Sequence, residues 1–239
     1  MRSYWKVSTQ QTRKDGYGAV YIEQQLIRYF SGKSSLILTL LGLLEVESGS
    51  VYIDGLDLST LSRDSIRTHI ITIPQDPVKL SGTVRQNIDP SEANLLSAAA
   101  GENNNARLIL ALTRVGMWDL IHDRGGLDAD FSDMNLSQGQ QQLFCLARAI
   151  HRREQSKIVL LDEPTSSVDR ETDQRVLKVI HEEFKHCTVI AVAHRLETII
   201  DSDLIVVMDA GRIQEAGKPN ILLEQPGSGF KALWDSRNG

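Results

Sequence analysis

The sequence predicts an α/β fold in which a mainly parallel sheet forms the core and a helical subdomain is inserted into it. Continuous apolar runs, typical of buried strands, occur at 158–161, 188–193 and 204–208, and an amphipathic helical pattern at 171–184 separates the first two. Uninterrupted apolar strands that alternate with helices belong to parallel sheets covered on both faces. Mainly helical signals from Gly82 to about Arg153 precede these strands, so we expect the helical insertion there.

Composition limits the classes of protein that this chain can be. With 239 residues, 41% of them hydrophobic and 24% charged, the chain can bury a sizeable core and is not of the disordered type. Its net charge of -5 opposes a nucleic-acid-binding role, which usually needs a basic face. The longest apolar stretch, Leu36–Leu44, is far below the roughly 20 residues that span a bilayer. We therefore expect no transmembrane segment in this chain.

The first third of the chain contains weaker signals for strands and turns. Residues Ala19–Ile22 fit a short strand, and Lys33–Leu44 predict a helix, because they are good helix formers that follow a glycine. Alternating residues up to Ile53 predict a strand that ends in a turn at Asp54-Gly55. A further short strand is stopped by Pro74, with Gln75 in the loop behind it.

The segment Ser31-Gly32-Lys33-Ser34 has the composition of the second half of a phosphate-binding loop. Binding of a polyphosphate needs backbone N–H groups at a helix N-terminus, a lysine for the β- and γ-oxygens and a hydroxyl for Mg²⁺. The segment supplies all three, although the tripeptide Gly32-Lys33-Ser34 before a helix also occurs by chance. The full pattern G-x-x-x-x-G-K-[ST] has a glycine where this chain has Ile27.

Polar side chains follow the predicted strands at their carboxyl ends, where ligands gather in open α/β sheets. Asp162 is placed to hold Mg²⁺ and Glu163 to polarise an attacking water, while His194 ends a neighbouring strand at the same edge. Gln75 also follows a strand and is within reach of a metal-bound water. The alternatives are a solvent-facing acidic pair, a structural histidine and a solvated amide.

The stretch "NLSQGQQQLFCLARAI" predicts a capped amphipathic helix. Asn135 and Ser137 are good caps, and Gly139 allows a backbone to approach a ligand closely. A plain capped helix is the alternative. Packing alone does not explain the three glutamines that follow Gly139.

Taken in this order, GKS, Gln75, LSQGQ, LLDEPTSSVD and His194 resemble the ATPase domain of ABC transporters, from about Ser31 to the C-terminus. The resemblance implies a P-loop NTPase of the ABC-ATPase type, with ATP and Mg²⁺ as ligands. The implied catalytic residues are Glu163, His194 and Gln75, and the implied metal ligands are Ser34, Gln75 and Asp162. The implied nucleotide-binding residues are Ser31, Gly32, Lys33, Ser34 and Ser35 (Walker A), Ser137, Gln138, Gly139 and Gln140 (signature), and Asp169 (D-loop).

The same resemblance implies the domain limits, the partners and the location. The ATPase domain spans 31–239, with a helical subdomain inserted at about 82–153, and residues 1–30 form an atypical segment. Two such domains pair head to tail, so that each ATP lies between the Walker motifs of one and the signature of the other. Hydrolysis then drives the transmembrane domains of an exporter, and the chain sits on the cytoplasmic face of a membrane through that partner. No nucleic-acid partner is expected.

Two departures from the family pattern leave alternatives open. Ile27 replaces the first glycine of Walker A, and Gln138 stands where the signature usually has glycine. A catalytically impaired fragment with weak or no nucleotide binding is therefore the second hypothesis. A soluble ABC-type ATPase that acts on DNA or ribosomes is the third, opposed by the acidic balance. It is also opposed by "SGTVRQNIDP", which resembles the second ATPase domain of family C, the multidrug-resistance-associated group.

Overall fold

The computed structural model describes residues 4–7, 19–24, 33–46, 49–90, 102–162, 170–193, 196, 199–209 and 212–238. The chain forms two compact units, which are described separately. The first consists of Met1–Thr72, Gln155–Glu163 and His186–Gly239, and the second of Ile73–Glu154 and Pro164–Lys185.

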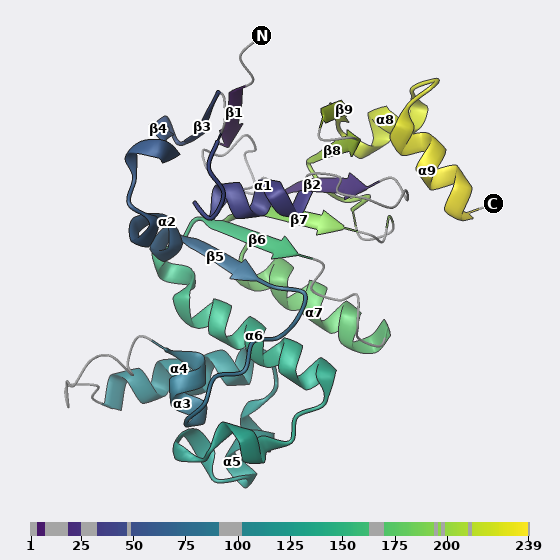
Figure 1. The fold of residues 1–239 in the computed structure, drawn as a ribbon. Coiled ribbons are helices and arrows are strands. Elements are labelled where there is room, and N and C mark those ends of the chain that lie inside the picture. Colours follow the sequence, from purple (N-terminus) through teal and green to yellow (C-terminus); the bar gives the residue numbers. More distant parts are fainter. Residues whose placement is uncertain are drawn as a thin grey trace. The chain divides into compact units, whose positions relative to one another are not determined.

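A six-stranded sheet with the order β5-β6-β7-β2-β8-β9 forms the centre of the first unit. Its strands are β5 (Ile70–Ile73), β6 (Ile158–Asp162), β7 (Thr188–Ala193), β2 (Ala19–Gln24), β8 (Leu204–Asp209) and β9 (Arg212–Gly217). The pairs β6–β7, β7–β2 and β2–β8 are parallel, and only the β8–β9 pair is described as antiparallel. Figure 1 shows β5, β6, β7 and β2 running in the same direction. The predicted parallel core is confirmed, and the strand expected at Ala19–Ile22 lies within it as β2.

A smaller sheet joins β1 (Tyr4–Val7), β3 (Ser50–Ile53) and β4 (Leu56–Asp57). β3 and β4 form an antiparallel hairpin in which Ile53 pairs with Leu56 across a two-residue turn. Both turn residues have positive φ, 49° at Asp54 and 84° at Gly55. This combination is that of a type I′ turn, for which an Asp-Gly pair is a preferred sequence. The turn predicted at these two residues is confirmed.

The helices of the first unit are α1 (Lys33–Leu40), α2 (Arg63–His69), α8 (Pro219–Glu224) and α9 (Gly229–Asn238), with a 3₁₀ turn, η1, at Leu58–Thr60. The helix expected at Lys33–Leu44 ends at Leu40, so that expectation was wrong at its carboxyl end. Gly42 adopts a φ of +64°, and the Leu43 N–H donates to the Leu38 carbonyl at 2.8 Å. This left-handed glycine closes the helix and satisfies its last carbonyl groups.

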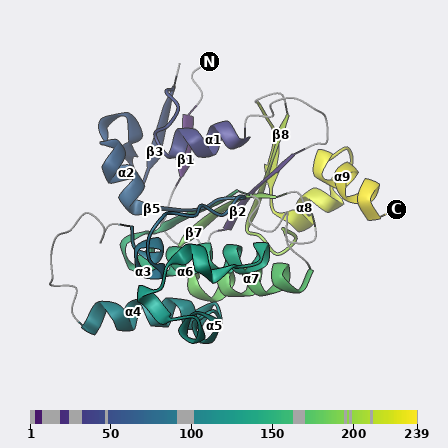
Figure 2. The same cartoon turned by 60° about the horizontal axis from the view of Figure 1, so that its bottom comes forward.

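The core of the first unit lies on both faces of the large sheet. Ile37 and Leu40 of α1 pack in a cluster with Leu160 of β6 and with Val206 and Met208 of β8. The residues of β8 that alternate with these two, Ile205 and Val207, belong instead to a cluster with Leu222 and Phe230. Because successive strand residues point to opposite faces, β8 is buried on both sides. Figure 1 and Figure 2 both show α8 and α9 beside β8.

Helices dominate the second unit. They are α3 (Val84–Ile88), α4 (Glu102–Arg114), α5 (Trp118–Asp123), α6 (Gln138–Arg152) and α7 (Arg170–Glu183), with the 3₁₀ turns η3 (Gly126–Asp128) and η4 (Phe131–Met134). The 3₁₀ turn η5 (Arg153–Gln155) follows α6. α6 contacts α3, α4 and α7, and Figure 2 shows α6 and α7 side by side. Within the described parts of the chain, no helix combines the length and the apolarity that a membrane span requires. The domain limits expected at residue 30 and at 82–153 stay predictions.

The two-sided core leads to a prediction for Leu160, which is completely buried in the middle of β6. We expect Leu160→Ala to lower the free energy of unfolding by about 2–5 kcal/mol, because it removes buried methyl groups and leaves a cavity. Urea denaturation followed by circular dichroism measures this loss. Leu56→Ala is the matched control, since Leu56 is 58% exposed, and its effect should stay within about 0.5 kcal/mol. Equal losses for the two variants would contradict the described core.

Candidate functional site

The carboxyl edge of the large sheet brings together the ends of three strands. Asp162, the last residue of β6, pairs with Val192 of β7, and the same Val192 pairs with Ile22 of β2. Since neighbouring strands lie about 4.8 Å apart, the Cα atoms of Asp162 and Ile22 are about 10 Å from each other. Ala193 is the last residue of β7 and directly precedes His194. The chain positions that follow β2, β6 and β7 therefore start from one short stretch of the sheet edge.

Helix α1 begins at Lys33, as predicted for the phosphate-binding segment. Its backbone N–H groups in the first turn have no carbonyl partner within the helix, and its first turn carries no acidic residue. Ser35 is exposed, and its carbonyl accepts a hydrogen bond from the Thr39 hydroxyl at 2.7 Å. Ser31 and Gly32 lie outside the described residues, as do the side chains of Lys33 and Ser34. The same holds for the preceding residues 25–30.

Asp162 is half-buried at the end of a strand whose other four residues are all buried. Glu163, Asp169 and His194 lie outside the described residues. Among the described residues, no group of three or more His, Cys, Asp or Glu side chains could form a metal cage. Mg²⁺ does not need one, since it is commonly held by one or two carboxylates together with phosphates and waters. A strand-end carboxylate and a serine hydroxyl are therefore donors of the kind that fits Mg²⁺.

Gln75 follows β5 in the chain and belongs to the second unit. Its side chain is exposed, like that of the neighbouring Asp76. Pro74, which ends the strand as predicted, is partly buried. An exposed amide on this loop is available to a ligand, and the metal-binding role expected for Gln75 stays a prediction.

Of the two predicted cap residues, only Ser137 initiates α6 in the second unit, whereas Asn135 ends the 3₁₀ turn η4. Asn135 has left-handed backbone angles, with φ 44° and ψ 48°, and Ser137 is extended and forms the N-cap. The Gln140 N–H donates to the Ser137 hydroxyl oxygen at 3.3 Å, and the Ser137 N–H donates to the Gln140 side-chain oxygen at 2.9 Å. This reciprocal capping box satisfies two donors at the helix start. Ser137 and Gln138 remain exposed, as a ligand contact requires.

Hydrogen bonds within the second unit explain the three glutamines that sequence reasoning could not. Gln140 completes the capping box, and the Gln141 amide donates to the Leu136 carbonyl at 2.6 Å. Gln142 is buried, and its amide donates to the Pro74 carbonyl at 3.2 Å. Each glutamine thus holds a different backbone group, and the nucleotide contact expected for Gln140 stays a prediction.

Gly139 is constrained by α7 as well as by any ligand. A Cβ atom at this position would lie 3.1 Å from Thr172 Cγ2 and 3.2 Å from Thr172 Oγ1. The first turn of α6 therefore approaches α7 so closely that a side chain here would require Thr172 to shift by a few tenths of an ångström. The sequence suggested that this glycine allows close approach to a ligand. The structure adds a second reason, which is its tight packing against Thr172 within the second unit.

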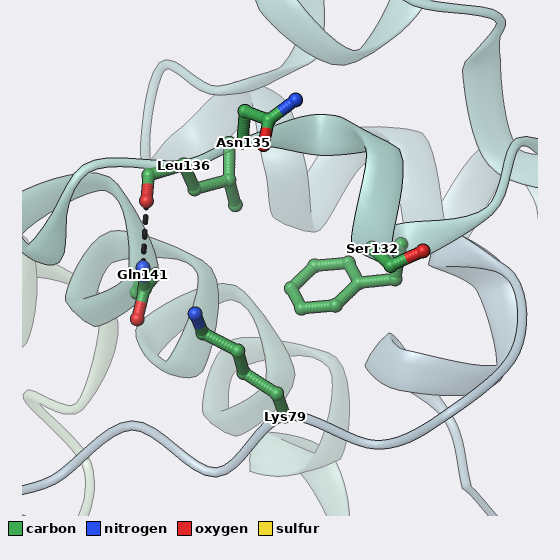
Figure 3. Close-up of a pocket in the computed structure, with 6 residues that line it drawn as sticks. Lys79, Ser132, Asn135, Leu136 and Gln141 are labelled. Carbon is green, nitrogen blue, oxygen red and sulfur yellow. Dashed lines mark hydrogen bonds between the residues drawn. The ribbon is translucent and has the colours of Figure 1, made fainter.

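A cavity of about 390 Å³ lies beside the start of α6 and was missed by sequence reasoning. Its lining consists of Lys79, Phe131, Ser132, Asn135, Leu136 and Gln141. Figure 3 shows the Lys79 ammonium group pointing toward the Gln141 side chain. No local pattern signals this cavity, because its walls come from three separate segments. An apolar ring beside an ammonium group suits an apolar group that carries a negative charge.

Asp130 fixes one wall of this cavity. Its Oδ1 accepts hydrogen bonds from the Ser132 hydroxyl at 2.6 Å and from the Ser132 N–H at 2.8 Å. These bonds hold the pKa of the Asp130 carboxyl below its ordinary value, because they stabilise the charged form. The turn is thus held by an ionised aspartate at neutral pH.

Comparison with known proteins identifies relatives for most of the chain. Residues 31–166 match the family model described as ABC transporter. The chain is 46% identical over 206 residues to "ABC multidrug transporter B" of Aspergillus fumigatus. This alignment covers 86% of the chain and 13% of that protein. The chain is 44% identical over 209 residues to "ABC transporter gloK" of Glarea lozoyensis, covering 87% of the chain and 15% of that protein. The chain thus spans about one seventh of the length of these relatives.

A solved structure described as "Structure of a bacterial Atm1-family ABC exporter with ATP bound" superimposes with a TM-score of 0.77 at 29% sequence identity. The match covers 92% of the chain and 36% of that protein. It agrees with the predicted ABC-ATPase fold. The second hypothesis, an impaired fragment, finds no support in these comparisons.

The capping box at Ser137 leads to a prediction that separates folding from ligand binding. We expect Ser137→Ala to lower the free energy of unfolding by about 1 kcal/mol, because the N-cap acceptor is lost. Ser137→Asp restores a cap acceptor and should stay within about 0.5 kcal/mol of the wild type. Thermal and urea unfolding of the three proteins measure these differences. A stability of Ser137→Asp as low as that of Ser137→Ala would contradict the cap.

Proposed function

Because the chain belongs to the ABC transporter family and forms the ATPase domain of that family, we propose that it hydrolyses ATP to energise a membrane exporter. The observation that carries the proposal is the shared edge of the sheet. There the carboxyl ends of β6, β7 and β2 lie close together, and α1 is the next described helix after β2. A triphosphate needs cationic, acidic and water-orienting groups within a few ångströms of one another. Parallel strands in this register supply such a place.

We propose that the phosphates lie at the start of α1. Its first-turn N–H groups, which have no partner within the helix, and its positive dipole end favour an anion, and Lys33 is the cation for the β- and γ-oxygens. Ser34, Asp162 and Gln75 would hold Mg²⁺ through their oxygen atoms. When bound, Mg²⁺ neutralises charge on the phosphate oxygens.

The catalytic groups act on the attacking water. Glu163 follows Asp162 directly and is proposed to accept a hydrogen bond from that water, which orients it and raises its nucleophilicity. His194 follows β7, the strand between β6 and β2, and is proposed to orient the γ-phosphate. Ser31, Gly32 and Ser35 complete the nucleotide contacts on the chain's own side.

We propose that a second ABC ATPase domain completes each site in a head-to-tail pair. The signature residues Ser137, Gln138, Gly139 and Gln140 then face the ATP of the partner domain, together with Asp169. Support comes from the exposure of Ser137 and Gln138 at the start of α6. Position 138 is exposed in this chain even though it is occupied by glutamine and not by the glycine that is usual in the family.

We propose that transmembrane domains are the other partner and that the domain works at the cytoplasmic face of the membrane. The relatives are transporters of which the chain matches only 13–15%, which leaves the greater part of each for other domains. We also propose that the chain is of the family C type and its second ATPase domain, because the segment Ser81–Pro90 resembles that group. Its Thr83 forms a capping box with Gln86 at the start of α3. No nucleic-acid partner is proposed, given the net charge of -5.

The role of Glu163 is tested by Glu163→Gln, which keeps the shape of the side chain and removes its charge. ATP turnover should fall by about 100-fold or more, because the group that accepts the hydrogen bond from water is weakened. ATP binding, measured by calorimetry, should change by less than about threefold, since the proposed contact is to the water. Glu224→Gln on α8 is the control, because Glu224 is exposed. Unchanged turnover in Glu163→Gln would refute the assignment.

The head-to-tail arrangement is tested by mixing two inactive variants. Lys33→Ala should destroy the Walker side and Ser137→Asp the signature side, so each alone should lack turnover. In a two-fold pair each mixed dimer keeps one intact site, so an equal mixture should regain roughly a quarter of wild-type activity. A mixture as inactive as its components would exclude a composite site formed by two copies of this chain.

A further inference from the structure

The loop that carries Gln75 is tied at both ends to α6, the helix that starts at Ser137. We infer that Gln142 and Arg148 of α6 are positioning residues for Gln75, because they hold the loop that carries it. This inference rests on the proposed function, because Gln75 acquires a role only in an ATP site. All the residues concerned belong to the second unit.

Gln142 holds the first end of the loop. Its side chain is 2% exposed, and its amide donates to the carbonyl of Pro74, the residue directly before Gln75. Cys145 and Leu146, three and four residues further along and thus on the same face of the helix, are buried and apolar. Burial of an amide costs free energy unless it is hydrogen-bonded. A buried glutamine on an otherwise apolar side of α6 is therefore explained by the carbonyl that it holds.

Arg148 holds the other end of the loop. Its Nη2 donates to the Val78 carbonyl at 3.2 Å, and its Nε donates to the Asn87 carbonyl at 2.7 Å. The guanidinium is largely desolvated, and burial lowers its pKa from the ordinary value. The rigid fork of arginine donors fits two carbonyl groups from two segments at once. One side chain thus links the loop to the end of α3.

Asn87 continues this attachment. Its side chain is completely buried, its amide donates to the Leu80 carbonyl at 2.9 Å, and its oxygen accepts from the Leu80 N–H at 2.9 Å. The loop itself has little packing of its own, since Gln75, Asp76 and Val78 are exposed. Its position therefore depends on these backbone attachments more than on buried side chains.

The attachment has a consequence for a head-to-tail pair. Gln75 would serve the ATP on its own chain, whereas Ser137, at the N-cap of the same α6, would face the ATP of the partner domain. Because Gln142 and Arg148 fasten the Gln75 loop to α6, a displacement of the signature displaces Gln75 as well. The helix thereby links the signature to the Gln75 loop of the same chain.

The test uses the full 239-residue chain with Gln142→Met, a substitution of similar volume that removes the amide donor. Hydrogen exchange of the nucleotide-free protein should show faster exchange in residues 75–80, by about fivefold, the factor that one net hydrogen bond supplies. The Mg²⁺ concentration for half-maximal ATP turnover should rise by a similar factor, about fivefold. The KM for ATP at saturating Mg²⁺ should change by less than about twofold.

Gln174→Met is the matched control, because Gln174 is exposed on α7 in the same unit. It should leave both the exchange of residues 75–80 and the Mg²⁺ requirement unchanged. In a double-mutant cycle, Gln75→Ala with Gln142→Met should need no more Mg²⁺ than Gln75→Ala alone, since Gln142 acts through Gln75. If Gln142→Met does not fold, Arg148→Lys provides the same test, because it keeps the positive charge and removes the pair of guanidinium donors that bind the Val78 and Asn87 carbonyls.

Two results would overturn the inference. One is wild-type exchange of residues 75–80 in a folded Gln142→Met protein, and the other is a loss in the double variant that adds fully to that of Gln75→Ala. Failure of the proposed function looks different, because the wild-type chain would then show no binding or turnover of ATP. In that case the inference fails too, even if the exchange data show that Gln142 holds the loop.

Discussion

The parallel pairing of β6 and β2 with β7 is the constraint on which the candidate site depends. Val192 of β7 lies opposite Asp162 on one side and Ile22 on the other. The register of this one strand therefore brings together two segments that are far apart in the sequence. Burial maintains this register. A slip by one residue would turn Ile190 and Val192 away from the cluster that they share with α1. The same apolar contacts that stabilise the sheet therefore align the groups at its edge.

The second unit depends on polar contacts around one helix. α6 is buried along its apolar side. Its three consecutive glutamines and Arg148 nevertheless form hydrogen bonds with backbone groups at the helix start and in other segments. Each buried amide or guanidinium compensates its loss of water with a carbonyl. This arrangement gives the Gln75 loop and the signature one common support. It also explains why a helix in an ATPase of this family carries polar residues where packing alone would favour leucine.

Several features were predictable because their signals are local. The parallel core follows from continuous apolar runs, the hairpin from Asp54-Gly55, and the start of α1 from the glycine before Lys33. Other features escaped because they depend on neighbours or on single caps. The end of α1 was placed too late, since the left-handed Gly42 stops the helix although Leu43 and Leu44 are good helix formers. The cavity beside α6 has walls from separate segments and leaves no pattern in any one of them.

By itself, the sequence determined the family resemblance, the order of the motifs and the type of each strand, because these are properties of short segments and their succession. Only the tertiary structure decided that β2 lies between β7 and β8, that β8 is buried on both faces, and that Gln142 meets the Pro74 carbonyl 68 residues away. The physical reason is that pairing and burial are relations between distant segments. A local period shows which face of a segment is apolar, but the partner that covers this face is chosen by the packing of the whole unit.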